Sequence, residues 1–401
     1  MNSSNPRGLP LLLLVLGILG ALAGCPPLDE SNKKTPPSEA HFDSGAHQRQ
    51  HGKDAKSESD PASAPAAADA KREHGHDLPK TATHWYCTMH GKPAGNSVHG
   101  IDENGTVLGA ILEAVPESAG GNAKGVRGML HLGEHGLLVV SANLADTRLI
   151  RYGPPASDGT LPFVSLFAQK ALKNPDLVHS YALAVGADGT VYASNQDTNT
   201  VSAYAGIGTA QPGAPLDVPK EIAGLGIPAG TIVPSRVVSP QGITEIRGIA
   251  IGADGLLYVC DRGAAQVVVF DPRTGLRLRV LADESHGLVH PIQLLFAPDG
   301  HTVYLTDNGM PGIFRIDTAT GAIILFANRS TGCPELPSSL AMDKDHLYVG
   351  DRKKQEILRF KLATGEPDHT PFAQLPDAPE FMIPASLLPA IPQSPKAKAD
   401  D

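Results

Sequence analysis

Ile246-Arg-Gly-Ile-Ala-Ile-Gly-Ala-Asp-Gly255 is followed by Leu256-Leu-Tyr-Val-Cys-Asp261 and Gln266-Val-Val-Val-Phe-Asp271. After a Pro-Arg-Thr-Gly275 turn, Leu276-Arg-Leu-Arg-Val-Leu281 completes the stretch. Short runs of β-branched and aromatic residues, separated by Asp-Gly and Thr-Gly turns, are typical of strands joined by tight turns. This stretch therefore predicts four short strands.

The four-strand unit is repeated along the chain, with copies that begin near Val126, Tyr181, Pro291 and Ser338. The last three copies are spaced by about 45 residues, which is a propeller-blade period. A four-stranded blade exposes two apolar faces and needs a neighbour on each side. A sixth, partial copy opens at Asn96, and we expect its missing first strand to come from around 381–388, which would close the ring.

We therefore predict an all-β fold, a six-bladed β-propeller of four-stranded blades over residues 81–390, with a loop insertion at 205–243 on one face. The pattern of strand, Asp-Gly turn, strand and final Asp resembles that of the NHL-repeat and gluconolactonase-like (SMP-30, or regucalcin-like) propellers. The resemblance covers roughly residues 84–388 and implies the same six-bladed fold.

The N-terminal segment carries Arg7, an apolar run over residues 9–22, and Leu22-Ala-Gly-Cys25. This ending resembles the bacterial lipobox, which implies a signal peptide over 1–24 and a lipid anchor on Cys25. The alternative is an ordinary cleaved signal with a chance cysteine. We expect a protein of the bacterial cell envelope on the periplasmic or extracellular face. Pro26, which is not the Asp of inner-membrane retention, favours the outer membrane if the cell is Gram-negative.

Residues 25–80 and 391–401 have compositions that cannot form a core. The first segment is rich in His, Pro, Ala and Ser, and it predicts a disordered tether; the second predicts a disordered tail. The chain has a net charge of -9 and no basic block, which argues against nucleic acid as a partner. Beyond Cys25 three cysteines remain, so at most one disulfide forms; Cys87 either packs or pairs with Cys333.

The start of each innermost strand of a propeller faces the central channel. In gluconolactonase-like enzymes these starts carry Asn and Asp, with a Glu from another blade, to hold a divalent metal such as Ca²⁺. The equivalent channel positions here, with Gln293 next to the fourth, are Arg127, Tyr181, Arg247, Ile292 and Ser338. None is a carboxylate and two are arginines. Two guanidinium groups suit a carboxylate or phosphate ligand, although they can also pair with acids or carbonyls inside the channel.

The second strands end in polar residues that predict a second ring, at the channel mouth: Asn143, Asn195, Asp261, Asp307 and Asp351. Such side chains commonly bond the backbone of the following turn, so we expect them to build the repeat. The three acids also suit a cation. His179 and His290, like His286, precede inner strands; they are either hydrogen-bonded turn residues or catalytic bases of the kind used by propeller lyases.

Cys87-Thr-Met-His90 is the sharpest local cluster of soft metal ligands. The Cys87 thiolate, the Met89 thioether and the His90 imidazole suit Cu(I) or Zn(II). The stretch loosely resembles the Cys-Pro-Met-His motif of heavy-metal-binding modules, with Thr88 in place of the proline. A strand through Trp85-Tyr86-Cys87 is the alternative, in which Cys87 packs in the core.

These observations favour a membrane-anchored, exported propeller that acts as a binding scaffold for a protein or an anionic small molecule. One alternative is a metal-dependent lactonase-like hydrolase or a propeller lyase. Another is the handling of a soft metal through Cys87, Met89 and His90. Whether the chain is an enzyme stays open, and the arginines at the strand starts favour binding.

Overall fold

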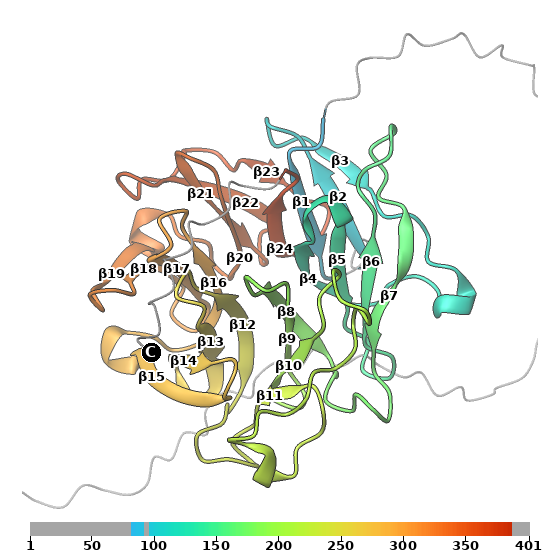
Figure 1. Ribbon diagram of the computed structural model, residues 1–401. Helices are drawn as coiled ribbons and strands as arrows, with labels where there is room; N and C mark the ends of the chain where they lie inside the picture. The colour runs from blue at the N-terminus through green and yellow to red at the C-terminus, as the bar shows by residue number, and fades with distance from the viewer. Residues whose placement is uncertain (1–81, 92–95, 387–401) are drawn as a thin grey trace, which may run out of the picture. The chain divides into compact units, whose positions relative to one another are not determined.

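Six antiparallel sheets of four strands each surround a central channel in the computed structural model (Figure 1), which describes residues 82–91 and 96–386. This arrangement is a six-bladed β-propeller and confirms the predicted fold. The predicted signal peptide, Cys25, the tether and the tail lie outside the described residues. Within the described residues, no helix has the length and apolar character needed to cross a membrane.

The blades are numbered from the N-terminus, and their strands are given from the channel outwards. Blade 1 contains β24 (Pro379–Pro384), β1 (Trp85–Met89), β2 (Ser97–Ile101) and β3 (Val107–Ala110). Blade 2 contains β4 (Val126–His131), β5 (Leu137–Ser141), β6 (Arg148–Tyr152) and β7 (Phe163–Gln169). Blade 3 contains β8 (Ser180–Val185), β9 (Val191–Asn195), β10 (Thr200–Tyr204) and β11 (Thr231–Val233).

The remaining three blades follow the repeat without exchange of strands. Blade 4 contains β12 (Ile246–Ile251), β13 (Leu257–Asp261), β14 (Gln266–Asp271) and β15 (Leu276–Ala282). Blade 5 contains β16 (Pro291–Phe296), β17 (Thr302–Asp307), β18 (Gly312–Asp317) and β19 (Ile323–Asn328). Blade 6 contains β20 (Pro337–Met342), β21 (His346–Asp351), β22 (Glu356–Lys361) and β23 (Ala373–Gln374). Short 3₁₀ turns in the connections are η1 (Glu117–Ala119), η2 (Gly133–His135), η3 (Ala223–Leu225), η4 (Arg262–Ala264), η5 (Glu284–His286) and η6 (Arg329–Thr331).

The ring is closed by strand exchange between the two ends of the domain. β24, the last strand in the chain, pairs with β1, the first, through Trp85↔Pro384 and Thr88↔Phe381. This confirms the prediction that the C-terminal segment supplies the missing first strand of blade 1. Blade 1 thus combines strands from both ends of the domain, and this pairing closes the ring without a free strand edge.

Apolar side chains pack between adjacent blades, where each sheet presents its two buried faces. Between blades 4 and 5, for example, Tyr258 and Val267 pack with Leu294 and Val303, all of them buried. Other clusters fill the spaces between blades 2 and 3, 5 and 6, and 6 and 1. Each fully buried aliphatic side chain contributes roughly 1.5–3 kcal/mol, so a blade is stable only between its neighbours.

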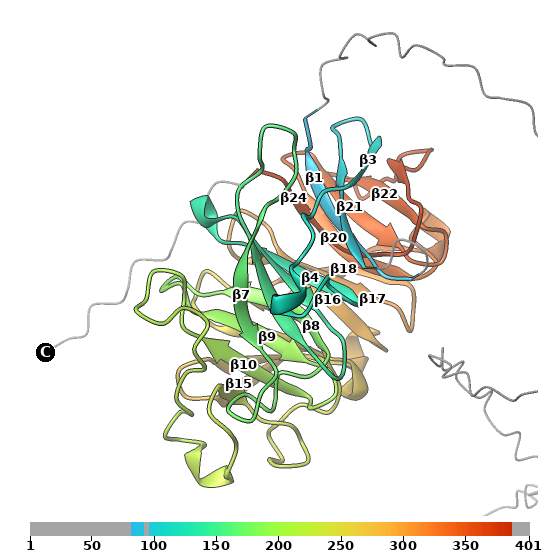
Figure 2. The same cartoon turned by 90° about the vertical axis from the view of Figure 1, so that its right-hand side faces the viewer.

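Strand direction gives the propeller two different faces (Figure 2). All six inner strands begin at one face, here called the mouth face, which also carries the loops between second and third strands and those that lead to the next blade. The opposite face, here called the far face, carries the other loops. Since β1 begins and β24 ends at the far face, residues 82 and 386 lie there.

The predicted insertion at 205–243 is not one loop on one face. Residues 205–230, with η3, form a far-face loop that projects from blade 3 at the lower edge of Figure 1. β11 follows as the outermost strand of that blade, paired through Val201↔Val233, and residues 234–245 cross the mouth face. The expectation was wrong because a three-residue strand gives too short an alternating pattern to recognise.

Candidate functional site

Each inner strand carries a β-bulge close to its start. In β4, for example, Val126 pairs with Ser141 and Met129 with Val139, so Arg127 and Gly128 lie opposite a single residue. Because all six strands share this irregularity, one bulged residue per blade occupies the same position: Arg127, Tyr181, Arg247, Ile292, Ser338 and Glu380. A bulge changes the direction of its side chain, which is how these strands present residues at the channel mouth.

Glycine follows two of the bulged arginines for a steric reason. A Cβ on Gly128 would lie 2.7 Å from the Tyr181 carbonyl oxygen, and one on Gly248 would lie 2.7 Å from that of Ile292. Contacts this short do not occur between a Cβ and a backbone oxygen, so only glycine lets the next inner strand approach. The Arg-Gly pairs at 127–128 and 247–248 therefore combine a channel side chain with close strand packing.

Glu380, which the sequence analysis missed, is the carboxylate at the centre of the site. Its side chain is 1% exposed, and Oε1 accepts a hydrogen bond from Arg127 Nη1 at 3.0 Å. Arg352 Nε lies 3.1 Å from Oε2, a close ion pair without hydrogen-bond alignment. Burial alone would raise the pKa of Glu380, but Arg352 and Arg127 hold it below its usual range. This carboxylate joins blades 6, 1 and 2.

Arg247 belongs to a second ion-pair group at the mouth, formed within blade 4 and the segment that leads to it. Its Nη2 donates to Glu245 Oε1 at 2.6 Å, and Arg262 Nη1 donates to the same oxygen at 2.7 Å. Arg247 Nη1 donates to the Ile246 carbonyl at 2.7 Å. The pairing with acids and carbonyls that the sequence left open thus occurs for both channel arginines, and each of the two carboxylates is shared by two guanidinium groups.

Several buried polar atoms around these ion pairs have no hydrogen-bond partner among the described residues. They include Arg127 Nε, His90 Nδ1 and Gln293 Oε1, and Arg127 is only 9% exposed. Buried polar atoms in folded proteins are nearly always partnered by protein, water or a ligand. The mouth therefore keeps spare hydrogen-bonding capacity, which includes a donor on Arg127 and acceptors on Gln293 and Glu380.

Tyr181 and two histidines complete the group of residues at the mouth. Tyr181 is buried, with its ring centroid 5.0 Å from that of Phe381, and burial raises its pKa. Burial, reinforced by the charge of Arg127, lowers the pKa of His90 to about 4. His179 Nδ1 lies 2.9 Å from Asp197 Oδ1, and burial lowers its pKa as well. These three side chains are neutral at neutral pH.

The other predicted histidines lie apart from the arginines. His286 is exposed in η5, where its ring contacts Asp283 at 3.0 Å in a capping box. The backbone N–H of His290 donates to Asp307, and its ring lies so close to Gly309 that a Cβ there would be 2.7 Å from Nδ1. Of the histidines considered as bases, the structure brings only His179 to the arginine cluster.

The three aspartates of the predicted ring of strand-end residues accept hydrogen bonds from backbone N–H groups. Asp307 accepts hydrogen bonds from four N–H groups, which belong to Val289, His290, Gly309 and Met310. Asp351 likewise accepts four, and Asp261 accepts those of Thr244 and Glu245. Asn195 bonds side chains instead, accepting from Ser180 Oγ and donating to Ser202 Oγ.

Asn143 does not hold the ring position in blade 2. The residue paired with the start of β4 is Ser141, whose Oγ accepts from Lys124 N at 3.0 Å and performs the aspartate's task. Asn143 lies two residues further on and accepts from Ala145 N and Asp146 N within its own turn. In blade 1 the same position is Met89. The strict aspartate ring therefore belongs to blades 4, 5 and 6.

The residues at the mouth do not fit the divalent cation that the gluconolactonase-like resemblance implies. Glu380 is held by two arginines, and the oxygens of Asp307 and Asp351 are engaged by backbone N–H groups. Over the described part of the chain, no group of three His, Cys, Asp or Glu side chains is arranged to hold a metal ion.

Cys87 and Met89 pack in the apolar cluster between blades 6 and 1, with Trp85, Ile101 and Met382. Both side chains are fully buried, and burial raises the pKa of the Cys87 thiol to about 12. His90, in contrast, lies with the mouth arginines. Cys87, Cys260 and Cys333 are all free thiols, so the pairing of Cys87 with Cys333 is not formed.

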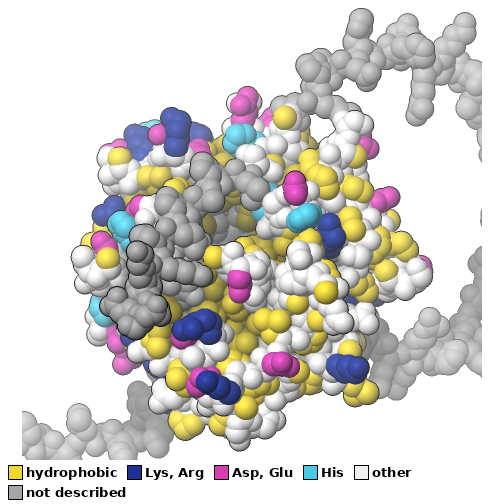
Figure 3. Space-filling view, in the orientation of Figure 1, with side chains coloured by type: hydrophobic (Ala, Val, Ile, Leu, Met, Phe, Trp, Pro, Cys, Tyr) yellow, Lys and Arg dark blue, Asp and Glu magenta, His cyan; other side chains and the backbone are white. Residues whose placement is uncertain are grey.

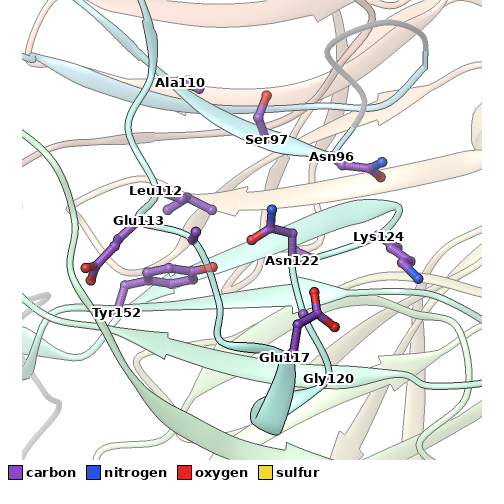
Figure 4. A pocket seen from close by; sticks show the side chains of 13 residues that line it. Asn96, Ser97, Ala110, Leu112, Glu113, Glu117, Gly120, Asn122, Lys124 and Tyr152 are labelled. Atoms are coloured by element: carbon purple, nitrogen blue, oxygen red, sulfur yellow. The ribbon is translucent and has the colours of Figure 1, made fainter.

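A hollow of about 500 Å³ lies between blades 1 and 2 (Figure 4). Asn96, which precedes β2, and Glu113, Asn122 and Lys124, from the connection between β3 and β4, line it. Asn96 Oδ1 accepts from Gly125 N, Asn122 Oδ1 from Val115 N, and Glu113 Oε2 from Phe163 N. The side chains of Asn96, Asn122 and Glu113 therefore help to hold the connection between β3 and β4 in place.

Charge on the outer surface shows no large basic field. On the face that Figure 3 presents, Lys and Arg side chains are interspersed with Asp and Glu. Surface ion pairs such as those of Lys353 with Glu335 and Lys361 with Glu366 match this distribution. The arginines of the mouth are therefore local to the channel.

No protein-family model and no curated protein sequence matches the chain. Among solved structures, a chain in the crystal structure of a nidogen/laminin complex superposes with a TM-score of 0.55 and 15% identity. The match covers 76% of this chain and 99% of that one. A computationally designed protein, Ika8, gives a TM-score of 0.40 and 14% identity over 74% of this chain and 76% of its own, which is too low to support an argument. These matches concern the fold alone.

Proposed function

We propose that this chain is a binding protein of the bacterial cell envelope whose channel mouth recognises an anionic, acceptor-rich group, a carboxylate or a phosphate. The observation that carries the proposal is the imbalance at the mouth. Four guanidinium groups share two carboxylates, and the buried Arg127 Nε has no partner among the described residues. Guanidinium groups bind carboxylates and phosphates in bidentate pairs, so such a ligand would use these donors.

Binding agrees better with the mouth than the predicted hydrolase or lyase chemistry does. A metal-dependent hydrolase needs carboxylates free to hold a cation, whereas Glu380 is held between Arg127 and Arg352. A lyase would have to use Nε2 of His179, since Nδ1 contacts Asp197 at 2.9 Å, so the contacts at the mouth argue chiefly against the hydrolase. A ligand that supplies negative charge needs no change in the contacts of Glu380.

The lipobox-like sequence at Leu22-Ala-Gly-Cys25 supports anchoring of this domain to a membrane, with the outer membrane the proposed location in a Gram-negative cell. The described chain begins at residue 82 on the far face.

Titration calorimetry on the purified full chain with acetate, glutarate and inorganic phosphate tests the proposal. We expect saturable binding of at least one anion, with affinity reduced about tenfold or more in Arg127→Met, because a guanidinium–anion pair is lost. Arg273→Met is the matched control, since Arg273 is an exposed arginine (85% of its side chain) in a far-face turn. Equal loss in both variants, or no binding of any of the three anions, would contradict the proposal.

A further inference from the structure

Exposed apolar side chains gather on the loops of the mouth face. The strongly exposed ones there are Leu144, Leu172, Val237, Val238, Val289 and Met310, here called the rim. Leu172 and Val237 are 101% and 96% exposed. Among the described residues, the far-face loops carry one comparably exposed large apolar side chain, Leu225, although they include the long 205–230 loop. The two faces therefore differ in apolar character.

The loops that carry the rim are held by their own hydrogen bonds. Lys170 Nζ donates to the Leu144 carbonyl at 2.9 Å, which ties the loop of Leu144 to the loop of Leu172. In the 234–243 segment, Arg236 N donates to Ile243 O at 2.8 Å and Ser239 N to Ser235 O at 3.0 Å. The N–H groups of Val289 and Met310 both donate to Asp307. The loops that carry the rim are thus held by hydrogen bonds before any partner binds, so binding does not have to order them.

The rim lies at the same face as a mouth of opposite character, on loops of blades 2 to 5. The loops of Leu172, Val237 and Val289 lead into the inner strands of blades 3, 4 and 5, and the bulged residue of blade 4 is Arg247. Leu144 lies on the loop between β5 and β6 of blade 2, the blade that carries Arg127. Protein interfaces commonly combine an apolar contact area with a few buried charged anchors, and arginine is enriched among those anchors. A free carboxylate or phosphate would occupy the arginines but would leave the rim exposed to water.

We infer that the mouth face is a docking surface for a protein partner that presents an Asp or Glu side chain to Arg127 and Arg247, while apolar side chains around it cover the rim. This inference rests on the proposed anion-binding function of the mouth and names its ligand class. Charge complementarity favours an acidic side chain on the partner, because the four guanidinium groups of the mouth share only two carboxylates of this protein.

A library of displayed, disulfide-closed random peptides, selected on the immobilised full chain, tests this inference. We expect the selected peptides to carry an Asp or Glu flanked by aliphatic or aromatic residues. A synthetic representative should lose about tenfold or more in affinity when its acid is changed to the amide, and a similar factor in Arg127→Met. In a double-mutant cycle the two losses should not add, because both changes remove the same pair.

Rim and control variants separate docking from anion binding. Leu172→Ser with Val237→Ser should weaken the peptide about tenfold and leave the affinity for acetate or phosphate unchanged. Leu276→Ser with Leu278→Ser, at exposed positions on β15, should change neither. If the anions bind but selection yields no peptide, or only peptides without an acid or insensitive to the rim, the docking inference fails alone. If the anions also fail to bind, the proposed function fails with it.

Two other occupants of the rim are decided by the same variants. Sedimentation velocity of the full chain in detergent measures self-association. Self-association that Leu172→Ser with Val237→Ser abolished would assign the rim to a second copy. Flotation with phosphatidylethanolamine–phosphatidylglycerol vesicles, done on the chain with Cys25→Ser, would assign the rim to lipid if the rim variant abolished it. Either result would overturn the docking inference, and we expect neither.

Discussion

Two kinds of buried carboxylate stand at the same face of this propeller. Asp307 in blade 5 accepts hydrogen bonds from four backbone N–H groups, whereas Glu380 in blade 1 is held by the side chains of Arg127 and Arg352. Backbone donors are fixed in number and position by the fold, so the partners of Asp307 are complete. Arginine side chains keep further donors, so the group around Glu380 is able to take another acceptor.

The same difference separates the two halves of the ring. Blades 4, 5 and 6 carry Asp261, Asp307 and Asp351 at the ends of their second strands, while blades 1, 2 and 3 carry Met89, Ser141 and Asn195. Blades 1 to 3 provide Glu380, Arg127 and Tyr181 to the mouth, and blades 4 and 6 provide Arg247, Arg262 and Arg352. The strict aspartate ring is thus confined to one half of the propeller, whereas the binding group draws on both.

Removing an acid from the strict aspartate ring tests the structural side of this comparison and should have the largest effect. Asp307→Ala leaves four N–H groups without their acceptor and should lower the free energy of unfolding by about 4 kcal/mol. Urea unfolding followed by Trp85 fluorescence measures this. The affinity of the folded protein for anions should be unchanged, and Asp307→Asn, which keeps one acceptor, should lie between. A loss below 1 kcal/mol would place Asp307 outside the structural framework.

Removing the acid from the mouth should have a smaller cost and an opposite effect on binding. Glu380→Gln leaves Arg127 and Arg352 without their counter-charge, which should lower the free energy of unfolding by about 3 kcal/mol. The released guanidinium groups should bind acetate or phosphate about tenfold more tightly. Added anion should therefore raise the melting temperature of the variant more than that of the unchanged protein. Equal shifts would show that Glu380 and the anion do not share these arginines.

The smallest expected effect concerns the pH dependence of stability. His90 has a pKa lowered to about 4, chiefly by burial, against about 6.5 in the unfolded chain. The unfolded state binds the proton first, so stability is complete above about pH 6.5 and is lower by about 2 kcal/mol at about pH 5. His90→Gln should flatten that part of the curve of unfolding free energy against pH. His286→Gln, at an exposed histidine, should leave it unchanged; identical curves for all three proteins would exclude His90 as the cause.

The repeat made the propeller predictable from sequence, because blades 2 to 6 each consist of four consecutive strands with their turns. The incomplete first copy made the ring closure predictable as well. It also placed Arg127, Tyr181 and Arg247 at the inner-strand starts, where the structure has them. The errors came from register. The closing strand was expected to start near Phe381, and it starts at Pro379, which left Glu380 out of the site.

A signal for Glu380 was nevertheless present in the sequence. Pro291-Ile292 and Pro337-Ser338 open the inner strands of blades 5 and 6, and Pro379-Glu380 repeats the pattern. The prediction of Asn143 in place of Ser141 is also an error of register. A shift of two residues keeps the same face of the strand, but the residue opposite the start of β4 is then a different one. The ion pairs and the rim join residues from separate blades, so no local pattern indicates them.

The exchange of strands between the ends of the chain also fixes when the site comes into existence. Synthesis of a chain proceeds from its N-terminus, so the arginines of blades 2 and 4 emerge long before β24. Until Pro379–Pro384 has arrived, blade 1 has no inner strand, and Arg127 and Arg352 have no shared carboxylate. A chain that ends before β24 has neither a closed ring nor an assembled mouth. The proposed binding at the mouth therefore requires synthesis of the chain through its last strand.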